Sequence, residues 1–225
     1  MRNTTLARLG LVLLLALLSS ACATSRGEMA LGIPGAKADY AEPTGDRVAV
    51  IEWVRDQRVF ETDPRDPSIP SLKKGSDYVL DAEGRKRAIA RKRNGYGMAL
   101  GDILLEGGET VETLTRDRVT TGLHERGIRV LEAGAQAPAD AIRLRVDIKE
   151  FWAWFSPGFW SVSMEAKLRM DFEVVDPVGD RKFTVSAYGI NKGQSGREAN
   201  WRLAYDRAFE DYLAKQRGAF QRHGL

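Results

Sequence analysis

The feature that most constrains this chain is a long run of alternating apolar and polar residues over positions 141–189. Every second residue of 142–148 is Ile, Leu or Val, and the same alternation returns over 162–174 and 183–187. A period of two is typical of strands with one buried and one solvated face. Residues 176–180 (DPVGD) predict the turn between the last two strands. We therefore expect a three-stranded antiparallel meander with one apolar and one charged face.

An aromatic segment, residues 151–160 (FWAWFSPGFW), separates the first two alternating runs. Pro157 and Gly158 predict the bend of a hairpin. If its rings are exposed, they are typical of surfaces that contact partners or membranes. If they fold over the end of the core, they are structural, and the sequence leaves both interpretations open. The candidate contact residues are Trp152, Trp154, Phe155, Phe159 and Trp160.

Two amphipathic segments predict helices that cover the apolar face of the meander. In residues 109–126 apolar or small side chains recur every four positions from Val111, and Gly127 predicts the stop before a short strand at 128–131. A capping box of Ser195 and Glu198 predicts the start of the second helix, with fraying expected over 218–225. The buried stripe of that helix is expected to be Trp201, Tyr205, Ala208, Phe209 and Tyr212.

A short apolar run and a long polar arm precede the first helix. Residues 48–54 (VAVIEWV) predict an inner strand. Residues 55–94 contain three X-Pro pairs, so we expect a loop or arm with little regular structure. The arm ends in a dense basic cluster, interpreted either as a solvated face or as a patch for anionic lipid headgroups, peptidoglycan or an acidic partner. Its residues are Arg85, Lys86, Arg87, Arg91, Lys92 and Arg93.

Together these segments predict an α+β fold: an antiparallel or mixed sheet with a long three-stranded meander and two helices packed on one face. We expect a single domain over residues 46–220 and a frayed tail at 221–225. The 225 residues, 43% hydrophobic and 29% charged, suffice for one core. The net charge of +3 includes Arg2 and Arg8 of the leader, so +1 remains beyond it and no nucleic-acid partner is expected.

The first 21 residues predict a secretory signal peptide, because basic positions precede the apolar run LGLVLLLALL. Small residues then precede Cys22, which resembles the bacterial lipobox. The triplet Ala21-Cys22-Ala23 also permits cleavage to a soluble periplasmic protein. Since Cys22 is the one cysteine of the chain, it can form no internal disulfide and no cysteine-based zinc site. We expect covalent diacylglycerol and an N-acyl lipid on Cys22, and a flexible tether over residues 22–45.

The sequence offers no arrangement typical of an enzyme, and we expect no activity, no metal and no dissociable cofactor. His124 lies where a cation suits the end of a helix. Asp171 and Glu173 share the charged strand face, where basic neighbours are expected to neutralise them. The glycine-rich segment 95–102 matches neither nucleotide-binding pattern and is interpreted as a turn.

The chain resembles the YajG-type bacterial lipoproteins and, more loosely, LptE and related envelope lipoproteins. The features that carry the resemblance are Cys22 after a short leader, the first strand followed by Asp56-Gln57-Arg58, residues 125–128, and the meander over 162–187. The resemblance implies a lipoprotein anchored in the outer membrane, since Ala23 rather than Asp follows the cysteine. We expect a non-catalytic binding or assembly module that faces the periplasm and contacts an envelope protein. The alternative is a carrier or accessory subunit that moves lipid or another apolar ligand between membranes.

Overall fold

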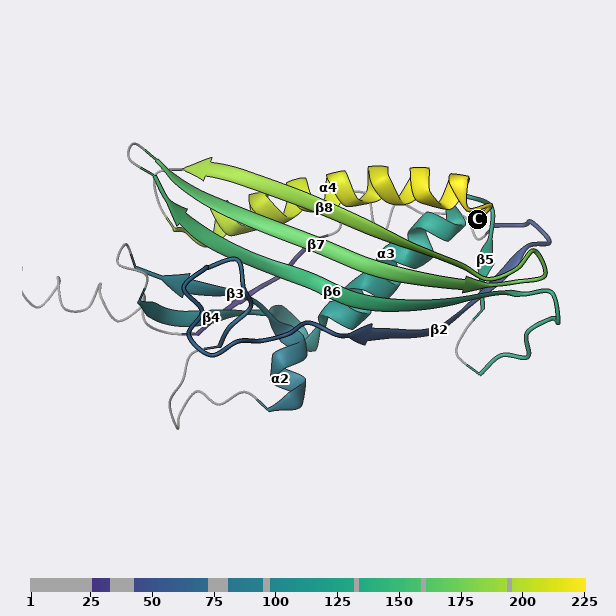
Figure 1. The fold of residues 1–225 in the computed structure, drawn as a ribbon, viewed down its shortest axis with the longest axis horizontal. Coiled ribbons are helices and arrows are strands. Elements are labelled where there is room, and N and C mark those ends of the chain that lie inside the picture. The colour runs from purple at the N-terminus through teal and green to yellow at the C-terminus, as the bar shows by residue number, and fades with distance from the viewer. Residues whose placement is uncertain are drawn as a thin grey trace, which may run out of the picture.

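The computed structural model describes residues 26–32, 43–72, 81–94, 98–131, 134–158, 161–193 and 196–225. Within these ranges, eight strands form one mixed sheet and three α-helices are present. Figure 1 shows the long strands side by side, with α3 (Val111–His124) and α4 (Glu198–Arg222) behind them. The α+β architecture predicted from the sequence is confirmed.

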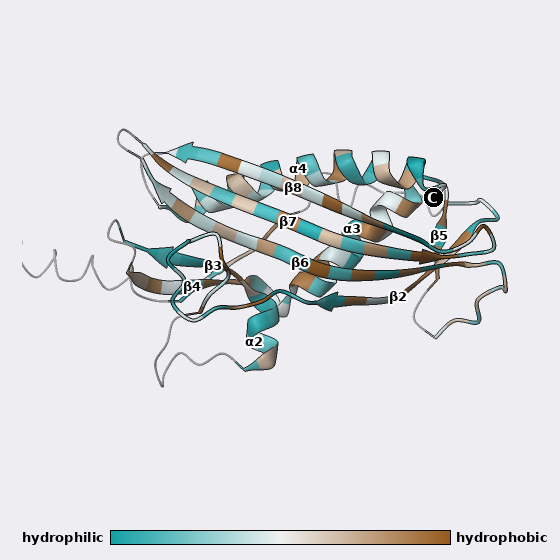
Figure 2. Ribbon diagram, in the orientation of Figure 1, coloured by the Kyte–Doolittle hydropathy of each residue, from teal (hydrophilic) through white to brown (hydrophobic). Residues whose placement is uncertain are grey.

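The predicted meander is the main body of the sheet. It consists of β6 (Ile142–Pro157), β7 (Val162–Val175) and β8 (Arg181–Gly193), paired antiparallel in that order. Figure 2 shows hydrophobic and hydrophilic residues alternating along all three strands. The strand β6 is longer than expected, because it continues through the aromatic segment almost to its end.

The length of β6 allows two strands to pair along the same edge. β2 (Val48–Asp56) runs parallel to its first half, and Ala90 of β3 (Ala88–Arg93) pairs in parallel with Ala153 in its second half. The short strand β5 (Arg129–Val130) extends the sheet beyond β2. On the other side β3 pairs antiparallel with β4 (Ala99–Leu105). Residues 99–102 of the glycine-rich segment are therefore strand, so the predicted turn is wrong for them, and residues 95–97 lie outside the described residues. The strand β1 (Gly27–Met29) then pairs in parallel with β4.

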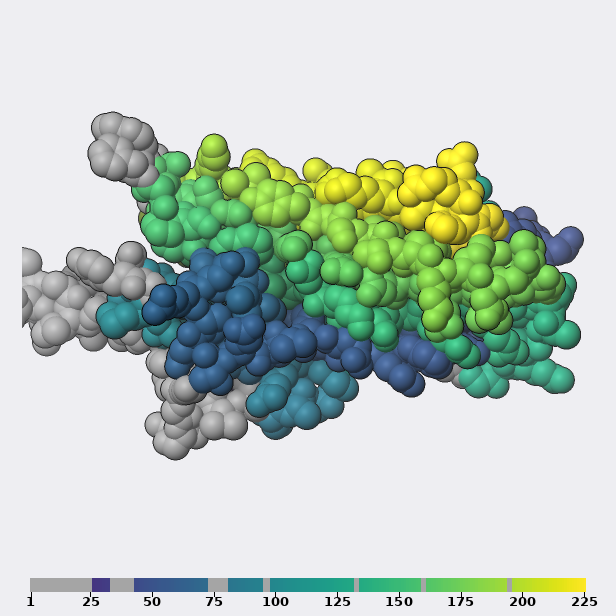
Figure 3. Space-filling view, viewed as in Figure 1, coloured from purple at the N-terminus to yellow at the C-terminus, as the bar shows by residue number. Residues whose placement is uncertain are grey.

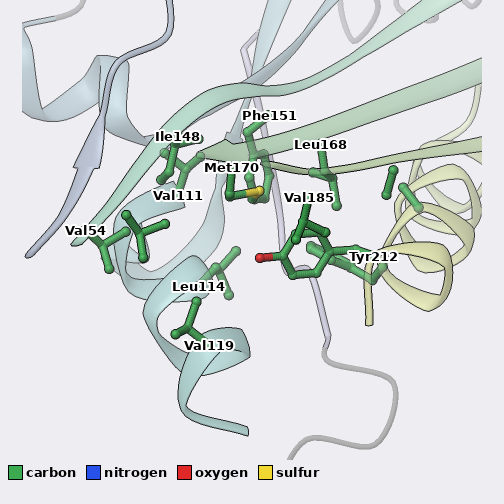
Figure 4. Close-up of a cluster of buried hydrophobic side chains, with 14 of the residues drawn as sticks. Val54, Val111, Leu114, Val119, Ile148, Phe151, Leu168, Met170, Val185 and Tyr212 are labelled. Atoms are coloured by element: carbon green, nitrogen blue, oxygen red, sulfur yellow. The ribbon is translucent and has the colours of Figure 1, made fainter. Parts of the chain in front are cut away.

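The main core lies between the meander and the two long helices. Figure 4 shows Leu168 and Met170 of the sheet facing Leu114 and Val119 of α3, with Tyr212 reaching in from α4. All five residues of the stripe predicted for α4 are buried. The apolar face of the meander therefore meets both helices, as the period-2 and helical patterns predict.

Local capping explains the limits of α3. Thr110 and Thr113 form a reciprocal capping box at its start. At its end the Ile128 N–H donates to the Leu123 carbonyl at 3.0 Å, and Gly127 adopts a φ of 71° that favours glycine. The helix thus begins and ends within two residues of the predicted range, and a 3₁₀ turn, η2 (Glu106–Gly108), leads into it.

Both predicted ends of α4 differ from the structure. The N-cap is Arg197, which makes no capping hydrogen bond through its side chain, and Glu198 is already helical; the predicted capping box is wrong, and Ser195 lies outside the described residues. The fraying predicted from Gly218 is also wrong, because Phe220 and Leu225 are buried in the core. The Leu225 N–H donates to the Phe220 carbonyl at 2.8 Å, which holds the turn after the helix.

Two segments expected to be irregular contain regular structure. Within the predicted tether, β1 joins the sheet, and Met29 and Leu31 are buried. Within the predicted arm, α2 (Ala82–Arg87) and β3 are formed, with the Asp81 carboxylate accepting from the Gly84 N–H. In both cases the strands are short and gain their partners from β4 or β6, so local periodicity gave little signal.

α4 packs against β8 with the two backbones almost in contact. A Cβ atom built on Gly189 would lie 2.1 Å from the Ala204 carbonyl oxygen and 2.4 Å from the Ala208 nitrogen. On the same strand, the Tyr188 N–H donates to the Asp211 carboxylate at 3.1 Å, and Arg207 donates to the Ile190 carbonyl. Side chains of α4 therefore bind backbone N–H and C=O groups on the free edge of β8, which would otherwise be open to pairing with another strand.

We predict that Gly189→Ala destabilises the protein by about 3 kcal/mol or more, because the methyl group must displace the backbone of α4. Gly218→Ala in the same helix is the matched control. Its new methyl group would meet only the end of the Arg222 side chain at 3.3 Å, so a gain of about 0.5–1 kcal/mol is expected. Urea denaturation followed by tryptophan fluorescence measures both, and an unchanged midpoint for Gly189→Ala would contradict the close approach.

Candidate functional site

The structure places two of the predicted aromatic contact residues inside the protein. Trp152 is 2% exposed and Trp154 is 9% exposed. They form a second, smaller cluster with Ala88 and Leu104. For these two residues the structure therefore corrects the interpretation as a free contact surface.

A β-bulge explains why this second cluster exists. The register of β6 against β7 shifts between Ile148 and Glu150. Before the shift the even-numbered residues of β6 face the helices; after it the odd-numbered Phe151 and Ala153 join the main core. Trp152 and Trp154 consequently point to the opposite face of the sheet.

The arm covers these rings. We call residues 57–72 the strap; its atoms, blue in Figure 3, lie over one end of the viewed face. The Phe60 ring packs edge-on against Trp152 at 5.9 Å between centroids. The Trp152 Nε1 donates to the Pro67 carbonyl at 3.3 Å, and Leu72 packs against the same cluster. The apolar surface created by the bulge is thus occupied by the chain itself.

The basic cluster divides between α2 and β3, and on α2 two of its members pair with acidic side chains of the body. Lys86 lies 3.3 Å from both Glu83 and Glu112, and the hydrogen bond to Glu112 is the main cause that raises the pKa of Lys86. Arg87 pairs with Glu28 of β1 at 2.6 Å and also donates to the Leu105 carbonyl.

The members on β3 hold the strap. Arg91 is buried, donates to the Ser71 hydroxyl at 3.0 Å and lies 3.6 Å from the Asp63 carboxylate. Arg93 donates to Ser71 and to the Pro64 carbonyl, and burial lowers the pKa of its guanidinium. Contacts with the protein's own polar groups therefore engage Lys86, Arg87, Arg91 and Arg93, which weakens the interpretation of the cluster as a free basic patch.

Arg58 is the residue of this region that sequence reasoning missed. Its buried guanidinium donates two hydrogen bonds to the Asp56 carboxylate, at 2.8 and 2.7 Å. It also donates to the carbonyls of Ala88, Phe151 and Arg85 at 2.6–2.9 Å. One side chain thereby joins the strap to α2, β3 and β6. The sequence shows only a lone arginine in a polar loop, and its partners lie up to 93 residues away.

The charged face of the meander carries a shallow hollow of about 350 Å³ around Trp53. Arg55 and Arg145 place their guanidinium carbons 4.1 and 4.7 Å from the centre of a Trp53 ring. Arg145 also donates to Glu52 at 2.7 Å, and this hydrogen bond is the main cause that lowers the pKa of Glu52. Stacked arginines and paired carboxylates give this surface polar binding capacity but no unpaired acid or base for proton transfer.

The carboxylate pair on the strand face has the polar and basic neighbours that the sequence predicts. Asp171 accepts from the Thr184 hydroxyl at 2.7 Å, and Glu173 lies 3.5 Å from Lys182, so the two carboxylates belong to a paired strand surface. His124 is the last residue of α3. Among the described residues no group of three or more His, Cys, Asp and Glu side chains is placed to hold a metal ion.

A buried polar group lies between α3 and α4. Arg118 is 1% exposed, stacks on Phe209 at 4.4 Å and donates to the Gly32 carbonyl at 3.3 Å. Burial lowers the pKa of Arg118 to about 10 and raises the pKa of Tyr212. The Arg118 contact fixes the end of the segment that begins with β1, which gives it a structural role.

The remaining predicted site residues are placed as follows. Phe155 is partly buried against the main core, Arg85 is exposed on α2, and Lys92 is half-buried on β3. Cys22, Phe159 and Trp160 lie outside the described residues. Acylation of Cys22 therefore remains a prediction of the sequence.

Comparison with known proteins identifies no family, since no family model and no curated protein matches the chain. A Xanthomonas campestris protein of the family DUF330 is 14% identical, with a TM-score of 0.44 over 88% of this chain and 93% of its own. An uncharacterized protein is 11% identical, with a TM-score of 0.40 over 88% and 99%. A minor lipoprotein of Acinetobacter baumannii is 15% identical, with a TM-score of 0.29 over 46% and 83%.

These likenesses are too weak to carry a functional argument, because every TM-score is below 0.5 and every identity is 15% or less. The comparisons do not name the YajG type or LptE, so that finer assignment stays a prediction.

We predict that Arg58→Met destabilises the protein by about 3–5 kcal/mol, because Asp56 would stay buried without its partner. Arg55→Met is the control: Arg55 is exposed and only stacks on Trp53, so a change within about 0.5 kcal/mol is expected. Equilibrium urea denaturation measures both. Equal, small losses would show that Arg58 does not hold the strap.

We further predict that Trp152→Ala costs about 3–5 kcal/mol of folding free energy, as expected for truncation of a large buried ring. Val59→Ala, in the strap itself but at a side chain that is 73% exposed, should leave the melting temperature unchanged. Thermal unfolding followed by circular dichroism compares the two. An unchanged melting temperature for Trp152→Ala would show that the ring is not part of the core and remains a candidate surface contact.

Proposed function

We propose that the protein is a lipid-anchored, non-catalytic lipoprotein of the bacterial envelope that acts as a binding or assembly module on the periplasmic side of the outer membrane. The sequence basis is the apolar leader followed by small residues and the lone Cys22. Acyl chains contribute about 0.8 kcal/mol for each buried CH₂ group, so several chains on one cysteine would hold the protein on a bilayer.

The observation that carries this proposal is the position of β1. Gly27 follows Cys22 by five positions, and from Gly27 the chain is paired into the sheet. Met29 and Leu31 are buried, and Arg118 holds the carbonyl of Gly32. A lipid on Cys22 would therefore hold a folded body close to the membrane, rather than a domain on a long spacer. This geometry suits a module whose partner lies at or near the same bilayer.

A non-catalytic role is supported by the way charged side chains are used. The carboxylates of the strand face pair with neighbouring basic residues, and the buried arginines bind carbonyls, hydroxyls or carboxylates of the chain itself.

None of the helices among the described residues combines the length and apolar character needed to span a bilayer.

The carrier alternative receives no support from the surface hollows. A carrier for lipid needs an apolar cavity of several hundred Å³. Four hollows lined by described residues have volumes of about 350, 380, 430 and 80 Å³, and charged side chains line each of these four. The binding or assembly role is therefore the function that we propose.

We predict that mass spectrometry of the native protein finds a diacylglyceryl adduct and an N-acyl chain on Cys22. Cys22→Ala should move the protein from the membrane to the soluble fraction, since the acylated sulfur would be gone. Ala23→Asp is the matched control: by the sorting rule of bacterial lipoproteins, it should stay acylated and appear in the inner membrane. A native protein that begins at Thr24 without lipid would overturn the proposed function.

A further inference from the structure

The strand directions gather several chain segments at one end of the body. β4 starts there, because it is antiparallel to β3, and β1 runs parallel to β4 with its first residue, Gly27, opposite Ile103. β3 and β6 run parallel and both end there. Because β7 is antiparallel to β6, and β8 is antiparallel to β7, strand β7 begins and strand β8 ends at the same end of the body. We call this the anchor end, and it lies opposite the marked C-terminus in Figure 1. Its element limits are Arg93, Ala99, Pro157, Val162, Gly193 and Glu198, and Gly27 lies four residues inside it, level with Ala153.

The opposite, far end holds the turn between β7 and β8 and the end of α4. Strand β6 has 16 residues and joins the two ends, so they are separated by about 50 Å at 3.3 Å per residue. Met98 at the anchor end is 63% exposed, and Val178 at the far end is 85% exposed. The two side chains mark the ends on the surface.

The chain between Cys22 and the sheet limits how far the anchor end can lie from an acylated cysteine. Five peptide units separate the Cα atoms of Cys22 and Gly27, and a fully extended chain covers at most about 18 Å over that number. The far end lies well beyond this reach. If Cys22 carries lipid, as the proposed function requires, the chain holds the body to the bilayer through Gly27, which lies on the side of the anchor end.

The charges at the anchor end suit an anionic membrane surface. Lys192 and Arg197 are exposed there and form no ion pair with another described residue. Two of the nearby carboxylates pair with arginines of the body, Glu28 with Arg87 at 2.6 Å and Glu198 with Arg202 at 2.8 Å. A third, Glu165, accepts from the Tyr188 hydroxyl at 2.6 Å. Basic side chains are attracted to anionic headgroups within about a Debye length, 8 Å at physiological ionic strength.

We propose that the anchor end is the membrane-facing surface of the protein and that Lys192 and Arg197 contact anionic phospholipid headgroups. The long axis of the sheet then points away from the bilayer, and the far end, with Val178, faces the periplasm. The strap and the charged strand face stand along the side of the body, where a partner in the same membrane can reach them.

The test measures how close two dyes on the acylated full-length protein lie to the membrane surface. Met98→Cys and Val178→Cys each provide one free thiol when Cys22 is acylated. The protein is reconstituted into vesicles of phosphatidylethanolamine and phosphatidylglycerol that carry a nitroxide on a fraction of the headgroups. The dye at position 98 should lose most of its fluorescence, whereas the dye at position 178 should keep nearly all of it. Equal quenching, or stronger quenching at 178, overturns the orientation.

A second comparison tests the headgroup contact. Lys192→Gln combined with Arg197→Gln should reduce quenching at position 98 to the level seen with phosphatidylcholine vesicles. Lys182→Gln combined with Arg222→Gln at the far end is the control, and it should leave the quenching at position 98 unchanged. If both pairs leave the quenching unchanged, the contact with anionic headgroups is wrong.

The outcome separates this inference from the proposed function on which it rests. Mass spectrometry of each labelled sample reports the acyl chains on Cys22, and flotation reports attachment to vesicles. A protein without acyl chains that fails to float overturns both. An acylated protein that floats but shows equal quenching overturns the orientation alone.

Discussion

The rest of the structure depends on the burial of one face of β6. Its 16 residues pair with β7 along one edge and with both β2 and β3 along the other. Its side chains from Ile142 to Phe155 supply apolar surface that α3 and α4 cover. Because each buried aliphatic side chain contributes about 1.5–3 kcal/mol, this face supplies much of the driving force for folding. The long strand also fixes the length of the body and separates its two ends.

The β-bulge between Ile148 and Glu150 gives rise to the second hydrophobic cluster. It turns Trp152 and Trp154 to the face that the helices do not cover, and an uncovered pair of indole rings would be an apolar surface patch. The strap covers them, and Arg58 and Arg91 hold the strap through buried hydrogen bonds. Trp152 and Trp154 of the aromatic segment and Arg91 of the basic cluster, which looked like parts of separate contact surfaces in the sequence, therefore belong to one internal interface with the strap.

The same topology determines what remains available to other molecules. The helices occupy one face of the sheet, and the strap occupies one end of the other. The charged strand face around Trp53 stays accessible, with its acids and arginines already paired. An accessible surface of this kind offers hydrogen bonds and stacking to a partner. It is compatible with the binding role that we propose.

The sequence by itself determined the elements whose signal is local. Period-2 alternation specified the first half of β6, β7 and β8, and helical spacing with Gly127 specified α3, because each pattern reflects one element and its immediate neighbours. The tertiary structure alone decided the roles of Arg58, Trp152, β1 and the last turn of α4. Their partners lie elsewhere in the chain: Arg58 binds Phe151 across 93 residues, and Gly27 of β1 pairs with Ile103. Burial and hydrogen bonding between such distant segments depend on how the sheet assembles, and no local pattern encodes them.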